Sequence, residues 1–334
     1  MSVGRKVRAA LGSSMFRYIV RRLLYMIPVA LGVSIISFIT MYAAGDPITL
    51  ITIGKPNITK AALDALRAYY GLNQPIPLQY LHWLANILQL NFGKSLLGGR
   101  PVNLIIANEI WPTAELQIIS VLIAFAISIP IAINSALKQY SKQDVTVTSF
   151  ALFGVSMPTF WLGLILIIAF SFTLGWLPAS GAAGAPYLWW GNPILDWIAH
   201  LILPIAVLVY VSLAQNIRLI RANMLEVLRS DYVLAARASG LSERTVIYKY
   251  ALRNAIMPVV TFLGIALGTM LSGAPMTEIV FSWPGLGRQF VMSTTNLDFP
   301  VIMGITMIIT VMALLANLIT DILYIYIDPR IRIT

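Results

Sequence analysis

Residues 116–137 read LQIISVLIAFAISIPIAINSAL and contain no charged side chain. A helix needs about 20 mostly apolar residues to cross the hydrocarbon core of a bilayer, so this stretch is long enough to span one. Five more uncharged windows occur in the chain: 23–44, a stretch within 145–177, 197–217, 254–277 and 299–320. The pattern predicts an all-α, polytopic membrane protein with six transmembrane helices.

The composition is that of a membrane protein rather than a soluble domain. Only 11% of the 334 residues are charged, whereas soluble domains carry about 25%. A net charge of +10 would suggest nucleic acid as the partner of a soluble protein. In this chain we attribute it to charge asymmetry across the bilayer and to contact with anionic headgroups, and we expect no nucleic-acid partner. The absence of cysteine excludes disulfides and thiolate metal sites.

The positions of Lys and Arg predict the orientation of the chain. If the N-terminus lies in the cytoplasm, 17 of the 23 basic residues fall on the cytoplasmic side and six fall outside. Five of these six lie in the loop 45–113, and long loops escape the positive-inside rule. We therefore expect both termini in the cytoplasm.

The apolar windows also predict the organisation of the chain. We expect a cytoplasmic segment 1–22, a first transmembrane helix 23–44, an extracytoplasmic helical subdomain 45–113, a core 114–327 with five transmembrane helices, and a cytoplasmic tail 328–334. Within the subdomain, Thr59 can cap one short helix that ends at Gly71, and Pro77 can open a second. Asn57 begins a glycosylation sequon, which matters only in a host that glycosylates.

No motif for catalysis or metal binding is evident. Gly93-Lys94-Ser95 resembles the end of a phosphate-binding loop, but that motif needs a glycine where Leu88 stands. The chain is therefore expected to hydrolyse no ATP itself. His82 and His200 are the only histidines, and neither belongs to a ligand cluster. We expect no catalytic residues, no metal and no cofactor.

Small and polar residues in the last two windows are candidates for helix packing or for a translocation pathway. Gly264, Gly268 and Ser272 recur at four-residue spacing, which permits close approach of helices. Asn317 is an intramembrane polar residue, and such residues mark pathways or helix contacts. Asp321 lies near the cytoplasmic boundary, where we expect it to pair with an Arg or Lys.

One polar island interrupts the apolar windows, because residues 231–258 read DYVLAARASGLSERTVIYKYALRNAIMP. Asp231 can begin a helix, Gly240 fits a helix end that needs positive φ, and Ser242 can cap a second helix. The island, within a cytoplasmic loop 229–256, is thus predicted to be helix–Gly–helix. Two interpretations remain open from the residues alone: a basic helix lying on lipid headgroups, or a smooth surface that inserts into a partner's cleft.

The stretch Ala235-Ala236-Arg237-Ala238-Ser239-Gly240 resembles the Ala-Ala-x-x-x-Gly core of the cytoplasmic loop of binding-protein-dependent ABC importer permeases. The acidic residue of the family's pattern is replaced here by Leu234. Nearly the whole chain resembles the dipeptide/oligopeptide-type branch, specifically its first (B-type) permease subunit. The matching pieces are RRLL at 21–24, GDP at 45–47, YGLN at 70–73, FWLG at 160–163, GWLPASG at 175–181, DYV at 231–233, ALRNA at 251–255, FSWPGLG at 281–287 and DPR at 328–330.

The resemblance implies a type I ABC importer permease fold and a set of partners. These are a second paralogous permease subunit, two ABC ATPase subunits and an extracytoplasmic solute-binding protein, assembled in a prokaryotic plasma (inner) membrane. The chain would then form half of the translocation pathway of an ATP-driven importer. The loop residues implied to couple to the ATPase subunits are Ala235, Ala236, Gly240, Leu241, Ser242 and Arg244.

The resemblance leaves the substrate open. Members of the branch carry dipeptides or oligopeptides, and similar proteins carry nickel, glutathione or oligosaccharides. The exposed tryptophans expected on the outer face suit sugars, but interfacial tryptophan is common in any membrane protein. A passive channel or a secondary transporter not coupled to ATP is the alternative from a different functional class.

Overall fold

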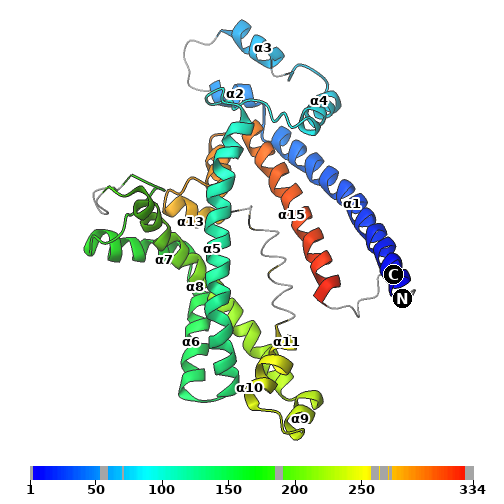
Figure 1. Ribbon diagram of the computed structural model, residues 1–334. Helices are drawn as coiled ribbons and strands as arrows, with labels where there is room; N and C mark the ends of the chain where they lie inside the picture. Colours follow the sequence, from blue (N-terminus) through cyan, green and yellow to red (C-terminus); the bar gives the residue numbers. More distant parts are fainter. Residues whose placement is uncertain are drawn as a thin grey trace. The chain divides into compact units, whose positions relative to one another are not determined.

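The computed structural model describes residues 3–52, 59–69, 71–184, 191–256, 263, 270 and 273–327. These residues are mostly helical, as Figure 1 shows, and they belong to two compact units. The first unit comprises residues 1–110 and 289–334, and the second comprises residues 111–288.

Two long helices pack along each other in the first unit. They are α1 (Val3–Ala43) and α15 (Phe299–Ile327). Arg22 Nε on α1 lies 3.1 Å from Asp321 Oδ2 on α15. The expectation that Asp321 pairs with a basic residue is therefore confirmed. Asn317 lines a cavity of about 160 Å³ beside this ion pair.

Three short helices follow α1 in the first unit: α2 (Pro47–Thr52), α3 (Lys60–Tyr69) and α4 (Ile76–Leu88). The Thr59 hydroxyl accepts a hydrogen bond from the Ala62 N–H at 3.3 Å, and Gly71 has a φ of +69°. The predicted cap and stop of α3 are thus confirmed. The sequence did not predict α2, which begins where the Asp46 carboxylate accepts the Ile48 N–H at 3.0 Å.

The second unit is built on long helices that share a core. Its main elements are α5 (Val102–Leu137, which begins in the first unit), α6 (Lys142–Ser156), α7 (Thr159–Leu166), the π-helical segment η1 (Ile167–Thr173) and α8 (Pro193–Leu228). The Asn192 side chain caps α8 by accepting the N–H groups of Ile194 and Leu195 at 2.9 and 3.2 Å. At 36 residues, α5 and α8 each exceed the roughly 20 residues that a bilayer requires.

Among the described residues, four helices are long and apolar enough to cross a membrane: Phe16–Ala43, Val102–Leu137, Pro193–Leu228 and Phe299–Ile322. They coincide with four of the six predicted windows. A fifth span is present if α6 and the α7–η1 segment count as one, but the helix axis bends by 103° between them. The window 254–277 lies mostly outside the described residues, and so do Gly264, Gly268 and Ser272.

Proline explains why the third window is not one straight helix. Pro158 has no N–H to donate, and its ring disfavours a helical backbone at the residue before it. Met157 accordingly has an extended backbone, with φ −84° and ψ 124°. Helix α6 therefore ends at Ser156 and α7 starts in a new direction at Thr159.

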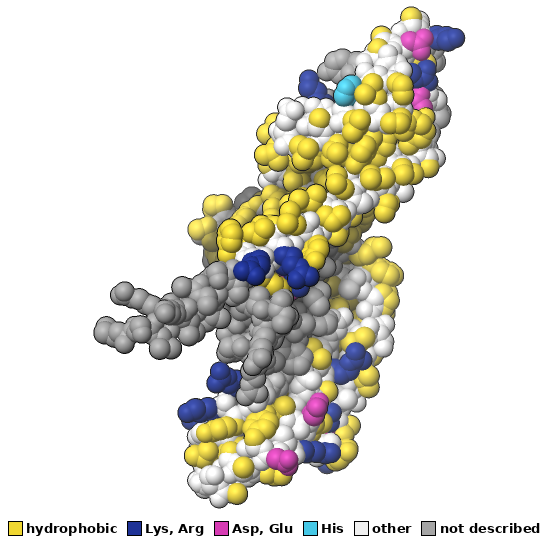
Figure 2. All heavy atoms as spheres, turned by 90° about the vertical axis from the view of Figure 1, so that its right-hand side faces the viewer, with side chains coloured by type: hydrophobic (Ala, Val, Ile, Leu, Met, Phe, Trp, Pro, Cys, Tyr) yellow, Lys and Arg dark blue, Asp and Glu magenta, His cyan; other side chains and the backbone are white. Residues whose placement is uncertain are grey.

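Large apolar side chains remain exposed along these helices. Ile36 on α1 is 63% exposed, Leu122 on α5 is 64% exposed and Phe172 in η1 is 76% exposed. Figure 2 shows hydrophobic side chains crowded on one face, with few Lys and Arg side chains among them. Lipid tails and apolar faces of other subunits are the surroundings in which such surfaces are stable.

Candidate functional site

The polar island folds as the sequence predicts. It forms α9 (Asp231–Ala238), α10 (Glu243–Thr245), the π-helical segment η3 (Val246–Ala251) and α11 (Leu252–Ala255). Gly240 has a φ of +76°, and the Ser242 hydroxyl accepts the Thr245 N–H at 3.4 Å. The helix–Gly–helix arrangement is thus confirmed, although the second helix changes to π geometry after α10.

Helix α9 has a buried face and an exposed face. Val233 and Ala236 are 0% and 7% exposed and belong to a core cluster that includes residues of α5, α6, α8 and η3. Leu234 on the opposite side is 51% exposed, and Tyr232 is 41% exposed. The unit thus holds α9 by one face and leaves an apolar face open.

Five of the six residues predicted to couple to a partner are exposed, namely Ala235, Gly240, Leu241, Ser242 and Arg244. Together with Tyr232 and Leu234 they are called the α9 surface below. Ala236, the sixth, is buried, so it supports α9 from within and does not form part of this surface. A Cβ at Gly240 would meet no atom within 4 Å, which makes the backbone there directly accessible.

Side-chain contacts hold the loop after α9 in place. Arg237 Nη2 lies 2.7 Å from Glu243 Oε1, and hydrogen bonds from this guanidinium hold the pKa of Glu243 below its usual value. Asn254 Nδ2 donates to the Tyr232 hydroxyl at 2.8 Å. The α9 surface is therefore an ordered element rather than a loose loop.

Only Arg229 and Ser230 separate α8 from α9. The Ser230 hydroxyl donates to the Val227 carbonyl at 2.6 Å, and Arg229 Nη2 donates to Gln139 Oε1 in the α5–α6 turn at 3.2 Å. Figure 1 shows α9 and α10 at the end of the second unit where α5 and α6 meet. Helix α9 is thus attached directly to the end of α8, which the Arg229–Gln139 contact holds beside the α5–α6 turn.

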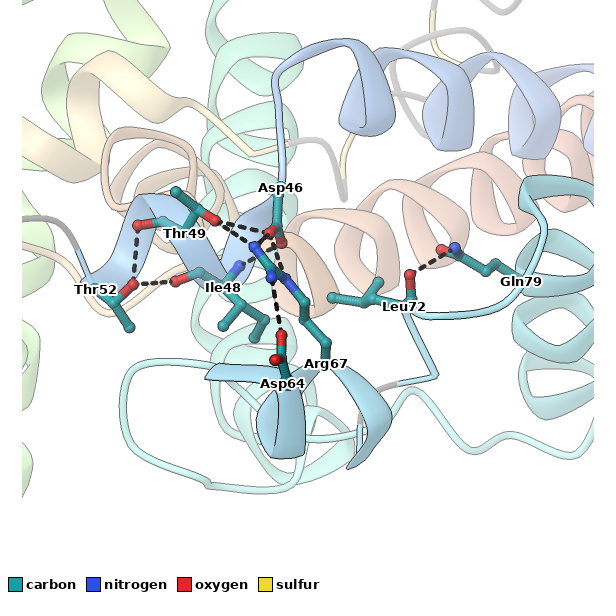
Figure 3. A network of polar contacts seen from close by, with 8 residues as sticks. All are labelled: Asp46, Ile48, Thr49, Thr52, Asp64, Arg67, Leu72 and Gln79. Atoms are coloured by element: carbon teal, nitrogen blue, oxygen red, sulfur yellow. Dashed lines mark hydrogen bonds and ion pairs between the residues drawn. The ribbon is translucent and has the colours of Figure 1, made fainter. Parts of the chain in front are cut away.

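The short helices of the first unit form a second candidate site. Figure 3 shows Arg67 of α3 reaching Asp46, with Nε and Nη2 at 2.9 and 2.6 Å from Oδ2. The Thr49 hydroxyl donates to the same oxygen at 2.7 Å. Burial raises the pKa of Asp46, but the hydrogen bonds from Thr49 and Arg67 outweigh burial and bring this pKa below its usual value. These contacts fix α3 to the start of α2.

A cavity of about 870 Å³ lies beside α4 within the first unit. Its walls include Phe38, Trp83 and Phe92, and its polar lining includes His82 and Lys94. No Asp or Glu is among its lining residues. The cavity therefore offers apolar walls and positive charge.

Sequence reasoning missed a buried carboxylate in the second unit. Glu278 on α13 (Pro275–Val280) is 1% exposed and accepts the Arg288 N–H at 2.8 Å and the Thr113 hydroxyl at 3.1 Å. A Cβ at Gly285 would lie 2.5 Å from this carboxylate. The glycines of the FSWPGLG stretch thus make room for Glu278, which ties this loop to α5. In the sequence, the one signal for this buried carboxylate is the set of glycines near it, Gly273, Gly285 and Gly287.

The chain was compared with known protein families. Residues 128–333 match the family described as binding-protein-dependent transport system inner membrane component, and residues 15–97 match the N-terminal region of such membrane components. The chain belongs to this family. It is a transmembrane permease subunit of a binding-protein-dependent ABC transporter, and its relatives are permease subunits rather than enzymes.

Two curated relatives cover almost the whole chain. The oligopeptide transport system permease protein AppB of Bacillus subtilis is 43% identical over 320 residues, which is 95% of this chain and 100% of AppB. The dipeptide transport system permease protein DppB of Escherichia coli is 37% identical over 337 residues, covering 95% of this chain and 99% of DppB. The predicted resemblance to the dipeptide/oligopeptide-type branch is therefore confirmed.

A solved structure supports the fold. An inward-facing form of the MetNI methionine ABC transporter matches with a TM-score of 0.51 at 16% identity, covering 67% of this chain and 96% of that chain. The predicted type I ABC importer permease fold is thus confirmed.

Proposed function

We propose that this subunit imports peptides by coupling to ATPase subunits through the α9 surface. The complete complex would contain a second permease subunit, two ATPase subunits and an extracytoplasmic solute-binding protein. The observation that carries the proposal is the two-sided burial of α9, with Val233 and Ala236 inside and Leu234 and Tyr232 exposed. Exposed apolar groups on an ordered helix favour a protein partner, because water alone does not stabilise them.

The geometry at Gly240 supports a close contact with that partner. Its lack of a side chain and the open space around it leave the backbone free to enter a narrow groove. Arg244 and Ser242 lie beside it and are exposed, so they can make polar contacts at the rim of such a groove. With both chain ends in the cytoplasm, as the distribution of basic residues favours, the α9 surface would face cytoplasmic ATPase subunits.

Single cysteines can test this contact because the chain has no native cysteine. We expect Cys introduced at Ala235 or Leu241 to crosslink to an ATPase subunit in the assembled complex. Cys introduced at Val233, which is buried, serves as the matched control and should not react. Equal crosslinking from all three positions, or from none, would contradict coupling through the α9 surface.

The outer helices α2, α3 and α4 are proposed to dock the solute-binding protein. The Asp46–Arg67 contacts fix α3 to the start of α2, and α4 lines a large cavity that also contains Lys94. Replacing residues 59–70 by a flexible linker of equal length should abolish stimulation of ATP hydrolysis by the binding protein while the complex still assembles. Unchanged stimulation would contradict the docking role.

Peptides are the proposed substrate class because AppB and DppB are named as oligopeptide and dipeptide permeases. Uptake of radiolabelled alanine peptides by reconstituted complex, driven by ATP and dependent on the binding protein, tests this assignment. Uptake of oligosaccharides but not of peptides would overturn it. Uptake without ATP would point to a channel or secondary carrier.

A further inference from the structure

Helix α6 begins with a buried carboxylate that none of the proposed functions uses. Asp144, in the first turn of α6, is 2% exposed. Arg221 of α8 donates to both of its oxygens, from Nε to Oδ1 at 2.6 Å and from Nη2 to Oδ2 at 2.8 Å. The Ser135 hydroxyl of α5 donates to Oδ1, and the Tyr140 N–H donates to Oδ2 at 2.9 Å. One carboxylate thus connects three helices and the turn between two of them.

A second contact holds α6 to α8 further along. A Cβ at Gly154 of α6 would lie 2.9 Å from the Ala214 Cβ of α8, so the two helices touch closely there. Phe150 and Tyr210 pack edge to face next to this point, with ring centroids 5.0 Å apart. Asp144 and Gly154 are ten residues apart, or about 15 Å along a helix. Attachment at two separated points prevents α6 from rotating against α8.

The Asp144–Arg221 pair lies on the side of the unit that carries α9. Arg221 lies seven residues, or about 10 Å, before the end of α8 at Leu228, and α9 begins at Asp231 directly after the two-residue connection. Ile220 and Met224 of α8, which flank Arg221 in the sequence, are fully buried in the core cluster that also contains Val233 and Ala236 of α9. Packed side chains therefore connect α9 continuously to the pair, so that a displacement of α9 would be transmitted to it.

We propose that the Asp144–Arg221 pair positions α9 for coupling, by making α5, α6, α8 and α9 move as one rigid body when the ATPase subunits displace α9. This rests on the proposed contact between the α9 surface and the ATPase subunits. In the absence of the pair, movement of α8 would let the α5–α6 turn lag behind, and ATP-driven movement would reach the membrane helices incompletely.

The chemistry of the Asp144–Arg221 pair is better suited to fixing the relative positions of the helices than to adding stability. A bidentate guanidinium–carboxylate contact fixes both distance and orientation, whereas apolar side chains can slide past one another. Buried ion pairs are often no more stabilising than apolar residues of the same volume. The pair is therefore better explained by the geometry it imposes than by the stability it adds.

Distances within the complex provide the first test. Spin labels on cysteines introduced at Gln143 of α6 and Ala238 of α9, both exposed, report whether these helices move together. The full complex is measured with and without ATP and vanadate, with other subunits free of reactive cysteine. In the wild-type background we expect one narrow distance that is the same in both states. A wild-type distance that changes with ATP would overturn the proposal.

The decisive variant replaces both partners, Asp144→Asn with Arg221→Met, so that no unpaired charge stays buried. We expect this double variant to assemble, to show a broadened Gln143–Ala238 distance in the ATP state, and to transport at least about fivefold less labelled alanine peptide per ATP. Fivefold is the lower end of the usual coupling between sites in proteins. Arg218→Met is the matched control, because Arg218 lies one turn earlier, is exposed and has no side-chain partner among the described residues.

The outcomes separate this proposal from the coupling contact itself. A double variant with the narrow distance and normal transport per ATP overturns the role of the pair, whatever the α9 crosslinks show. If Cys at Ala235 fails to crosslink to the ATPase subunit in both the wild type and the double variant, the proposed contact of the α9 surface is contradicted instead. Crosslinking retained in the double variant, together with lost transport per ATP, supports the proposal.

Discussion

Two Asp–Arg pairs of the protein share the same shortest contact distance but lie in very different surroundings. Arg67 Nη2 lies 2.6 Å from Asp46 Oδ2, and Arg221 Nε lies 2.6 Å from Asp144 Oδ1. In the first pair the Arg and Asp side chains are 35% and 33% exposed, and in the second they are 21% and 3% exposed. The first joins short outer helices, and the second joins long helices beside α9. The comparison indicates that burial, rather than contact distance, determines how much stability is lost when each pair is removed.

Removing one partner of the buried pair should have the largest effect. Asp144→Asn leaves the Arg221 guanidinium without its counter-charge, and loss of one partner from a buried pair costs about 3–5 kcal/mol. We expect a corresponding drop in the free energy of unfolding of the detergent-solubilised complex. The double variant Asp144→Asn with Arg221→Met should regain most of it. A loss no larger than that of Asp46→Asn would remove the contrast between the two pairs.

Crowding the second α6–α8 contact should have the next largest effect. Gly154→Val adds side-chain atoms where Ala214 Cβ lies only 2.9 Å away, and overpacking of this kind costs about 1–3 kcal/mol. The free energy of unfolding measures this cost. Combining Gly154→Val with Ala214→Gly should restore part of the stability, because the second change removes the opposing methyl group. No recovery would mean that the two helices do not touch at this point.

Two substitutions at Gly240 distinguish the effect of backbone strain from the effect of contact with a partner. Its φ of +76° disfavours a side chain, but a Cβ would meet no neighbour, so Gly240→Ala should cost only about 1 kcal/mol of stability. Gly240→Trp should additionally lower transport per ATP, since the indole would keep the loop out of a groove. Normal transport per ATP in Gly240→Trp would favour the alternative, a helix resting on lipid headgroups.

The exposed outer pair should have the smallest effect on stability. Arg67→Gln should lower the free energy of unfolding by about 1 kcal/mol or less, because exposed pairs are weak. The pKa of Asp46 is lowered in the folded chain, so its stabilisation is present above its unfolded pKa of about 3.9. It is lost only as the pH falls through the lower folded pKa. Between pH 8 and 5, the free energy of unfolding should therefore change with pH in the same way in wild type and in Arg67→Gln. Denaturation curves measured at several pH values in this range check this.

Much of the fold could be predicted because its signals are local. Uncharged windows gave four spans, Thr59 and Gly71 gave the limits of α3, and Gly240 gave the end of α9, because each depends on residues close in sequence. The break at Pro158 was also a local signal, but the continuous apolar window concealed it. Helix α2 escaped prediction because six residues carry too little periodicity.

The contacts that join distant segments could not be predicted in the same way. Asp144 and Arg221 are 77 residues apart, and nothing in either local sequence indicates that they meet. Glu278 is surrounded by glycines and by Thr113 only after α5 and α13 have packed. Ala236 was assigned to the coupling surface by resemblance, whereas helical packing places it inside.

The two-residue connection between α8 and α9 makes chain length itself a determinant of orientation. One residue inserted near the end of α8 would turn everything after it by about 100° and advance it by about 1.5 Å. Such an insertion would carry α9 around the axis of α8 and away from the core cluster that buries Val233 and Ala236. Insertions and deletions in this part of the gene are therefore expected to be counter-selected more strongly than substitutions. Comparison of insertion frequencies along related genes would measure this.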